Sequence, residues 1–167
     1  MTIEQKVARI FRLNDENWMR HANPKSVWSR FSVLPLLIVA FWSRAWIGWW
    51  ALIPVTLALA WMFLNPVAFK PPKSTRNWAS KAVLGERVWS NRRDIPVPEQ
   101  HRLLPSVLNG FSAAGMLLVI WGVVNLSVWP TITGAVVGVT FKLWYVDRMV
   151  WLYEDMKHVP EYGTWLY

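Results

Sequence analysis

The residues best suited to chemistry lie in the stretch 142–156, KLWYVDRMVWLYEDM, which is apolar and yet rich in charge. On a helix its ionisable groups and the nearby histidine fall on two adjacent stripes: Asp147, Glu154 and His158 on one, and Arg148 and Asp155 on the other. Ionisable groups beside such apolar sequence are costly unless they are paired or face a polar cavity. We therefore treat these side chains as candidate functional residues.

Two further motifs add polar groups to this set: Arg20, His21 and Asn23 in WMRHANPKSVW, and Glu86 and Arg87 in GERVW. One hypothesis makes the whole set structural, as a layer of ion pairs and hydrogen bonds that seals a helix bundle. Arg148 would then pair with Glu86 or Asp155, and Arg20 with Glu16 one helical turn earlier. Arginine suits such a layer because its planar fork matches a carboxylate.

The competing hypothesis is a polar site, either catalytic or for a metal ion or small ligand. It gathers five groups around one cavity: His21, Glu86, Asp147, Glu154 and His158. Imidazole and carboxylate ligands suit Zn²⁺, Mn²⁺ or non-haem iron, and His21, Glu154 and His158 are the candidate metal ligands. The sequence has no HExxH motif, histidine-rich box or glycine-rich phosphate loop. We therefore predict no cofactor, leave a metal ion open and name no catalytic residue.

Two long apolar blocks must position these groups: Phe31–Phe69, whose one charge is Arg44, and Leu103–Trp151. A membrane core about 30 Å thick needs roughly 20 apolar residues for each helical crossing. The first block is long enough for two short crossings if the chain turns at Ser43–Gly48, where several of the 14 Trp gather. The second block predicts crossings at 104–128 and 131–146, with small residues suited to close helix contact.

The predicted fold is therefore all-α: an integral membrane four-helix bundle of two hairpins, with an amphipathic N-terminal helix and a helical middle loop. It is a single membrane domain with these parts: an interfacial segment 1–24, a first hairpin 25–69, a basic loop 70–103, a second hairpin with a helical extension 104–158, and a tail 159–167.

Local signals set the expected helix ends. The first membrane helix should run from Lys25 to Trp42 and the second from Trp49 to Leu64, because Asn65-Pro66 is a breaker. Ser74 or Thr75 should cap a helix reaching Trp89. A turn is expected at 127–130, before the fourth membrane helix.

Charge predicts the orientation and the partners. The formal net charge is +8, and Lys and Arg concentrate in the N-terminal 30 residues and in the middle loop. Positive loops stay in the cytoplasm, so both termini and the middle loop should be cytoplasmic, beside anionic lipid headgroups. Other membrane subunits or self-association are open as partners, whereas no module for nucleic-acid binding is visible. A soluble protein is disfavoured because its core helices seldom lack a polar face over such lengths.

Trp18–Trp28, WMRHANPKSVW, and Asp147–Met156, DRMVWLYEDM, resemble a family of small Trp-rich multi-pass membrane proteins of archaea and bacteria, catalogued as a domain of unknown function. Asn65-Pro66 and Gly85–Trp89 extend the resemblance less distinctly, over most of the chain. The resemblance implies residence in the cytoplasmic membrane of a prokaryote and supplies no activity.

These observations together predict a non-enzymatic interaction protein or accessory subunit of a membrane assembly. The alternative is a membrane-embedded enzyme, or a protein that binds a metal or small ligand, with a polar site at the cytoplasmic interface. A transporter is disfavoured because Arg44 and Lys142 are the candidates for intramembrane charge and both can snorkel. A haem or pigment protein is disfavoured because the apolar segments lack histidine.

Overall fold

The computed structural model describes Gln5, Ile10, Phe11 and residues 14–167, so the amphipathic helix predicted for Thr2–Leu13 lies largely outside the described residues. The described part is all-helical and contains no strand. Its elements are α2 (Asp15–His21), α3 (Pro24–Arg30), α4 (Val33–Trp42), α5 (Arg44–Ile47), η1 (Gly48–Ala51), α6 (Leu52–Ala68), α7 (Trp78–Ser90), η2 (Glu99–His101), α8 (Leu104–Val124), α9 (Val128–Met156) and α10 (Pro160–Gly163).

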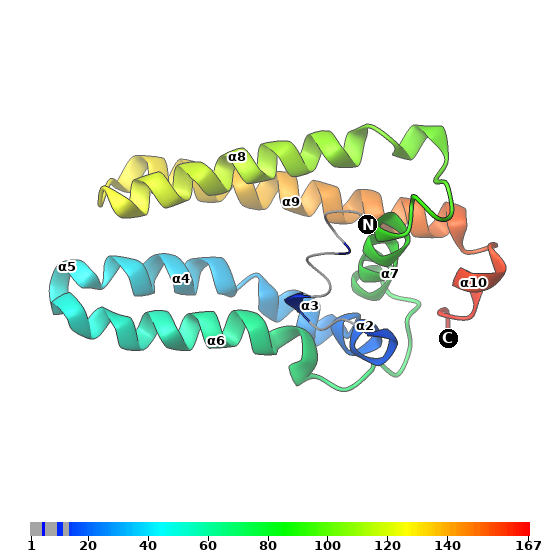
Figure 1. Cartoon of the computed structure of the whole chain (residues 1–167), viewed down its shortest axis with the longest axis horizontal. Coiled ribbons are helices and arrows are strands. Elements are labelled where there is room, and N and C mark those ends of the chain that lie inside the picture. Colours follow the sequence, from blue (N-terminus) through cyan, green and yellow to red (C-terminus); the bar gives the residue numbers. More distant parts are fainter. Residues whose placement is uncertain (1–4, 6–9, 12–13) are drawn as a thin grey trace.

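Two antiparallel helix pairs extend in the same direction from a shared base (Figure 1). We call the base the head (residues 14–30, 70–103 and 147–167), and the pairs the first hairpin (31–69) and the second hairpin (104–146). The first hairpin is built from α4 and α6, and the second from α8 and the longer part of α9. The ends of the hairpins remote from the head are their tips.

The first hairpin reverses where the sequence predicts. Helix α5 and the short 3₁₀ helix η1 occupy the turn, and Gly48 takes a φ of 56°, a value that favours glycine. The helix predicted over 25–42 is wrong in one respect, because it is interrupted at Phe31 and Ser32. Pro35 explains the break, since it has no N–H to bond the Phe31 carbonyl and its ring crowds that carbonyl.

The predicted helix end at Asn65-Pro66 is also wrong. Helix α6 continues to Ala68, with Pro66 inside its last turn. Asn65 is fully buried there and bonds two serines of α3: its Nδ2 donates to Ser29 Oγ at 2.7 Å, and its Oδ1 accepts from Ser26 Oγ at 3.3 Å. These bonds hold the last turn in place although Pro66 removes one backbone hydrogen bond.

Glycines allow the two helices of the second hairpin to approach closely. A Cβ placed on Gly115 would lie 2.8 Å from the Gly138 Cα, and one on Gly134 would lie 2.6 Å from the Val119 backbone nitrogen. The predicted turn at 127–130 is displaced: the chain reverses at Asn125–Leu126, and Pro130 lies in the first turn of α9, where its missing N–H costs nothing.

Arg44 joins the two hairpins at their tips. Its Nη2 donates to the carbonyl oxygens of Val123 and Val124, at 2.6 and 2.7 Å. These are carbonyls of the last turn of α8, which have no partner within their own helix. A cation is favourable there because the C-terminal end of a helix carries partial negative charge.

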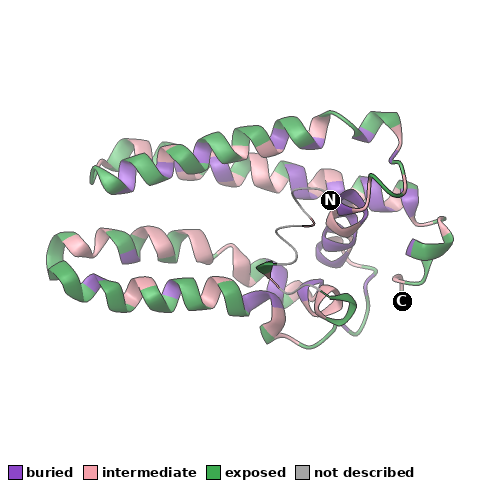
Figure 2. Cartoon of the chain, viewed as in Figure 1, coloured by how far each residue is buried: buried purple, intermediate pink, exposed green. Residues whose placement is uncertain are grey.

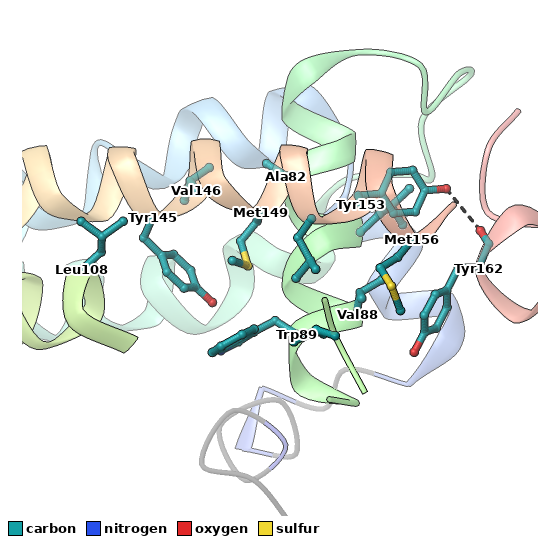
Figure 3. Close-up of a cluster of buried hydrophobic side chains, with 13 residues drawn as sticks. Ala82, Val88, Trp89, Leu108, Tyr145, Val146, Met149, Tyr153, Met156 and Tyr162 are labelled. Carbon is teal, nitrogen blue, oxygen red and sulfur yellow. Dashed lines mark hydrogen bonds between the residues drawn. The ribbon is translucent and has the colours of Figure 1, made fainter. Parts of the chain in front are cut away.

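Most of the buried core residues lie in the head, where α7 crosses the C-terminal half of α9. Trp89, Leu152, Tyr153 and Tyr162 are buried together, and the Tyr153 hydroxyl donates to the Tyr162 carbonyl at 3.2 Å (Figure 3). Gly85 makes the crossing possible, because a Cβ at this position would collide with the Met149 carbonyl. The middle segment 70–103, predicted as a helical loop, therefore contributes α7 to the centre of the core.

The N-cap predicted for α7 is wrong. Asn77 caps the helix, because its side chain accepts from the Ser80 N–H at 2.9 Å. Ser74 and Thr75 instead bind the other end of the chain: the Thr75 N–H and the Ser74 hydroxyl donate to the Tyr167 oxygen at 2.8 and 2.9 Å.

The hairpins differ from α7 of the head in burial: most hairpin residues are exposed or intermediate, whereas α7 is largely buried (Figure 2). Large apolar side chains cover their outer surface, and four tip tryptophans, Trp46, Trp49, Trp50 and Trp129, are 73–87% exposed. Within the described residues, Pro24–Ala68 and Glu99–Val124 are long and apolar enough to cross a membrane. The first of these regions folds back on itself at Gly48.

Candidate functional site

Two of the carboxylates predicted on the last part of α9, Asp147 and Glu154, are bound by side chains from α7. Glu154 lies 2.5 Å from Lys81 and 2.7 Å from Lys157. Asp147 accepts a hydrogen bond from the Trp78 indole at 3.1 Å. Because α7 packs against α9, each carboxylate meets a partner that is distant in sequence.

The partners predicted for Arg148 are wrong. It contacts neither Glu86 nor Asp155 but lies 3.3 Å from its neighbour Asp147 and 5.7 Å from the Trp151 ring centroid. Its buried Nε has no hydrogen-bond partner among the described residues. The α7–α9 crossing instead places Lys142, six residues earlier on α9, opposite Glu86.

Asp155 instead binds His101. The His101 Nε2 lies 2.7 Å from Asp155 Oδ2, and the Gln100 amide donates to the same oxygen at 3.3 Å. Both partners come from η2, a short element that the sequence reading did not single out. The histidine is buried, so this contact anchors the connection from α7 to α8 onto α9.

The N-terminal motif residues secure α2 and α3. Arg20 lies 2.9 Å from Glu16, the pair that their spacing predicts. The Asn23 side chain caps α3 by accepting from the Lys25 N–H at 2.9 Å, and it donates to the Lys70 carbonyl at 2.8 Å. The Asn23 contacts fix the start of α3 against the connection that follows α6.

Arg87 joins three parts of the head. Its guanidinium pairs with Asp15 at the start of α2 and lies 4.0 Å from the centroid of the Trp165 ring. It therefore ties α7 both to α2 and to the segment after α10. A cation over the face of an indole is attractive in its own right.

Glu86 lies at the base of the gap between the hairpins. Its Oε1 accepts from Lys142 Nζ at 2.9 Å, and Arg30 is close enough to act on it electrostatically. Burial raises the pKa of Glu86, but Lys142 and Arg30 outweigh burial and bring that pKa below its usual value. Glu86 is therefore an ionised carboxylate between two cations.

His21 contacts the same arginine. Its ring nitrogens approach the Arg30 guanidinium, with Nδ1 at 3.2 Å, and its ring packs edge-on against Trp18. Burial, and then the charges of Arg30 and Lys142, lower the pKa of His21 well below its ordinary value of 6.5. The imidazole is therefore neutral at pH 7.

A cavity of about 320 Å³ opens beside Glu86. Both hairpins and α7 contribute to its wall, which is mostly apolar. Its charged lining residues are Arg30, Glu86 and Lys142, and the remaining lining residues include Leu34, Ala82, Ser112, Met116 and Val139. Of the five residues expected around one cavity, Glu86 alone lines this one.

The predicted metal candidates do not converge. Within the described part of the chain, no group of three or more His, Cys, Asp or Glu side chains is arranged to hold a metal ion. His21 faces Arg30, Glu154 is occupied by two lysines, and His158 is exposed at the end of α9.

Sequence reasoning missed Arg30, Lys81 and Lys142 as partners of the candidate carboxylates. Lys142 carried a usable signal, since it is the first charged residue after Arg102 and interrupts the second apolar block. Arg30 and Lys81 carried none, because many basic residues surround them in the sequence.

No curated protein and no solved structure matches the chain. A family model described as "Family of unknown function (DUF6653)" matches residues 2–165, and so spans all of the elements described above. This match agrees with the resemblance seen in the tryptophan-rich motifs. The chain belongs to this family of unknown function, DUF6653.

Proposed function

We propose that the chain is an integral membrane protein of two membrane-inserted hairpins, with its head and both termini on the cytoplasmic side. It acts there as a non-enzymatic interaction protein, an accessory subunit of a membrane assembly. The hairpins provide the anchor, and the head provides the surface that a partner recognises.

The distribution of charge supports the membrane anchor. Between Arg102 and Lys142 the sequence has no charged residue, and between Arg30 and Lys70 it has one, Arg44. The outer faces of both hairpins are apolar, with Leu57 65% and Leu117 68% exposed. In water such a surface would aggregate, whereas in lipid it is satisfied.

The lengths of α6 and α8 agree with a thin crossing, whereas α4, with 10 residues, is shorter. At 1.5 Å per residue, the 17 residues of α6 span about 26 Å and the 21 residues of α8 about 31 Å. A hydrocarbon core is about 30 Å thick, and small mismatches are absorbed by local thinning. The exposed tip tryptophans would lie at the opposite interface, where indole rings are favoured.

The orientation is supported by the exposed cations of the head. They include Lys25, Lys70, Lys73, Arg76, Arg93 and Arg102. Basic segments remain on the cytoplasmic side, where anionic lipids attract them. Arg44 does not oppose this orientation, because its charge is engaged by the α8 carbonyls.

One observation carries the non-enzymatic assignment: the candidate groups are engaged with partners from other elements of the head. Glu154, Asp155, Asp147 and Arg87 all hold partners from a different part of the head. A catalytic acid, base or metal ligand needs a proton or a lone pair that is available to the substrate or the metal. Side chains that are paired within the head stabilise the arrangement of its helices instead.

The test is the native mass of the endogenous protein after mild solubilisation, with mass spectrometry of the proteins that migrate with it. We expect an assembly well above the 19.5 kDa of the chain, with partners in fixed ratio. The same chain produced alone in a foreign host is the size control. Migration of the endogenous protein at the size of that control would contradict the accessory role.

A second function, binding of a small ligand at the cytoplasmic interface, is supported by the cavity beside Glu86. It is compatible with the accessory role, because the cavity lies between the hairpins and not on the outer surface of the head.

A further inference from the structure

The cavity beside Glu86 lies where the two hairpins meet the head, and its wall changes character along the hairpin direction. Arg30 ends α3, and Glu86 is on the head helix α7, so the charged groups are near the head. Leu34, Met116 and Val139 lie further along α4, α8 and α9 toward the tips. One end of the cavity is therefore charged and the other is apolar.

The charged end carries a surplus of positive charge. Two cations, Arg30 and Lys142, face one carboxylate, Glu86, and the low pKa of Glu86 keeps it ionised. His21 behind Arg30 is neutral at pH 7 and does not alter this sum. An uncompensated charge in partly buried surroundings is unfavourable, so the site is complementary to one negative charge.

Lys142 can contact a ligand without leaving Glu86. An ammonium group has three N–H donors, and one of them is directed at Glu86 Oε1. Lys142 lines the cavity, its side chain is 45% exposed, and its ammonium also lies 4.3 Å from the Tyr145 ring centroid, so a donor remains for a ligand in the cavity. The volume of about 320 Å³ is within the usual range for small-ligand pockets, at its lower end.

We infer that this cavity binds an anionic amphiphile, with its phosphate or carboxylate group at Arg30 and Lys142 and the start of its apolar chain against Leu34, Met116 and Val139. The inference rests on the proposed membrane location, since an acyl chain can enter the cavity between the hairpins from the lipid phase. Charge complementarity selects the anionic group of the ligand, and the apolar wall selects its acyl chain.

The test is native mass spectrometry of the full chain, purified in a non-ionic detergent and stripped of lipid. Dioleoylphosphatidylglycerol is titrated against dioleoylphosphatidylcholine, which has the same chains without net charge. We expect one tightly bound phosphatidylglycerol per chain, and at least about tenfold weaker binding of phosphatidylcholine. Equal binding of the two lipids would overturn the inference.

Two charge variants test the charged end of the cavity, and they should change the affinity for phosphatidylglycerol in opposite directions. Lys142→Met should weaken phosphatidylglycerol binding at least about tenfold, whereas Glu86→Gln should tighten it, because it removes the competing carboxylate. Lys73→Met removes an exposed cation outside the cavity and should leave binding unchanged. A loss in Lys73→Met equal to that in Lys142→Met would show that net charge alone attracts the lipid, and would overturn the assignment.

Shape variants test the apolar end without changing charge, and they remain informative if Lys142→Met fails to fold. Val139→Phe fills part of the cavity and should abolish tight binding, whereas Val136→Phe adds the same ring on the exposed face of α9, where Val136 is 60% exposed. Unchanged binding in Val139→Phe would place the lipid elsewhere and contradict the inference.

Inorganic phosphate separates the lipid from a soluble anion. It should fail to displace phosphatidylglycerol at millimolar concentration, because it lacks the apolar chain. Displacement would assign the cavity to a free anion and overturn the amphiphile. Membrane fractionation of the cells that produce the protein separates the proposed membrane function from the proposed lipid site. A chain absent from the membrane fraction contradicts the membrane function. A membrane-bound chain without lipid preference contradicts the cavity assignment alone.

Discussion

At the scale of single residues, burial and a neighbouring charge set the protonation state of His21, whose neighbour is Arg30. The imidazole is 7% exposed and faces a guanidinium, and this environment favours its neutral form. Sequence reasoning singled out His21 as a ligand candidate because imidazole commonly binds metals. Its partner in the structure, Arg30, is nine residues away across the junction of α2 and α3. Helical periodicity does not predict a contact across such a junction.

The low pKa of His21 predicts a loss of stability in acid. Below its ordinary pKa of 6.5 the unfolded chain takes up a proton at His21, whereas the folded chain does not until a lower pH. The free energy of unfolding therefore falls as pH decreases from about 6.5 to 5, by up to about 1.4 kcal/mol per pH unit from this group. Thermal unfolding in detergent, followed by circular dichroism across this range, measures the loss.

Two variants assign that pH dependence. His21→Gln should flatten it, since glutamine does not titrate, and His158→Gln should leave it as in the wild type, because His158 is exposed. Glu86, with its pKa below the usual carboxylate range, contributes at lower pH than this window. A wild-type slope in His21→Gln would mean that another group is responsible.

At the scale of elements, the crossing of α7 and α9 holds the candidate residues in place. It brings Trp78 to Asp147, Lys81 to Glu154 and Glu86 to Lys142. The sequence predicted both helices and the side of α9 that carries its carboxylates. It could not predict the rotation of one helix against the other, and this rotation decides that Lys142, and not Arg148, meets Glu86.

The rotation depends on the close contact between Gly85 of α7 and the Met149 backbone of α9. Gly85→Ala should lower the free energy of unfolding by about 1–3 kcal/mol, because the added methyl collides with the Met149 backbone and forces the helices apart. Gly110→Ala is the matched control: among the described residues, no atom beyond its chain neighbours and its own helix backbone lies within 4 Å of the added Cβ, and alanine is the better helix former by up to about 1 kcal/mol. Thermal unfolding in detergent should separate the two, and an equal effect of both would contradict the tight crossing.

Helix ends show where local signals are sufficient. The reversal at Ser43–Gly48 was predicted from its own breakers, and the structure agrees. The break at Phe31–Ser32 had a local signal, Pro35, that the sequence reading did not use. The cap of α7 was misassigned for a different reason: Ser74 and Thr75 bind Tyr167, about 90 residues away, and no local rule anticipates that contact.

At the scale of the whole molecule, the sequence predicted an all-helical chain with long apolar segments, and the structure confirms both. Composition is sufficient for this, because the hairpins hold two charged residues, Arg44 and Lys142, and the remaining charge is concentrated outside them. It did not predict that the middle segment forms the centre of the core, since α7 has few long apolar side chains and is buried mostly through small ones such as Ala79, Ser80 and Ala82.

The central claim is that both hairpins cross the membrane from one side. The chain has no cysteine, so single cysteines can be labelled without background. Ala45→Cys and Asn125→Cys place a thiol at each tip, and Lys73→Cys and Glu161→Cys place one on the head, all at exposed positions. A membrane-impermeant maleimide is then applied to intact and to permeabilised cells.

We predict that the tip cysteines react in intact cells and that the head cysteines react only after permeabilisation. That result would establish a crossing by each hairpin and a cytoplasmic head. If the tip cysteines also stay unreactive until the cells are permeabilised, the tips and the head lie on the same side, and the two-hairpin membrane topology is wrong.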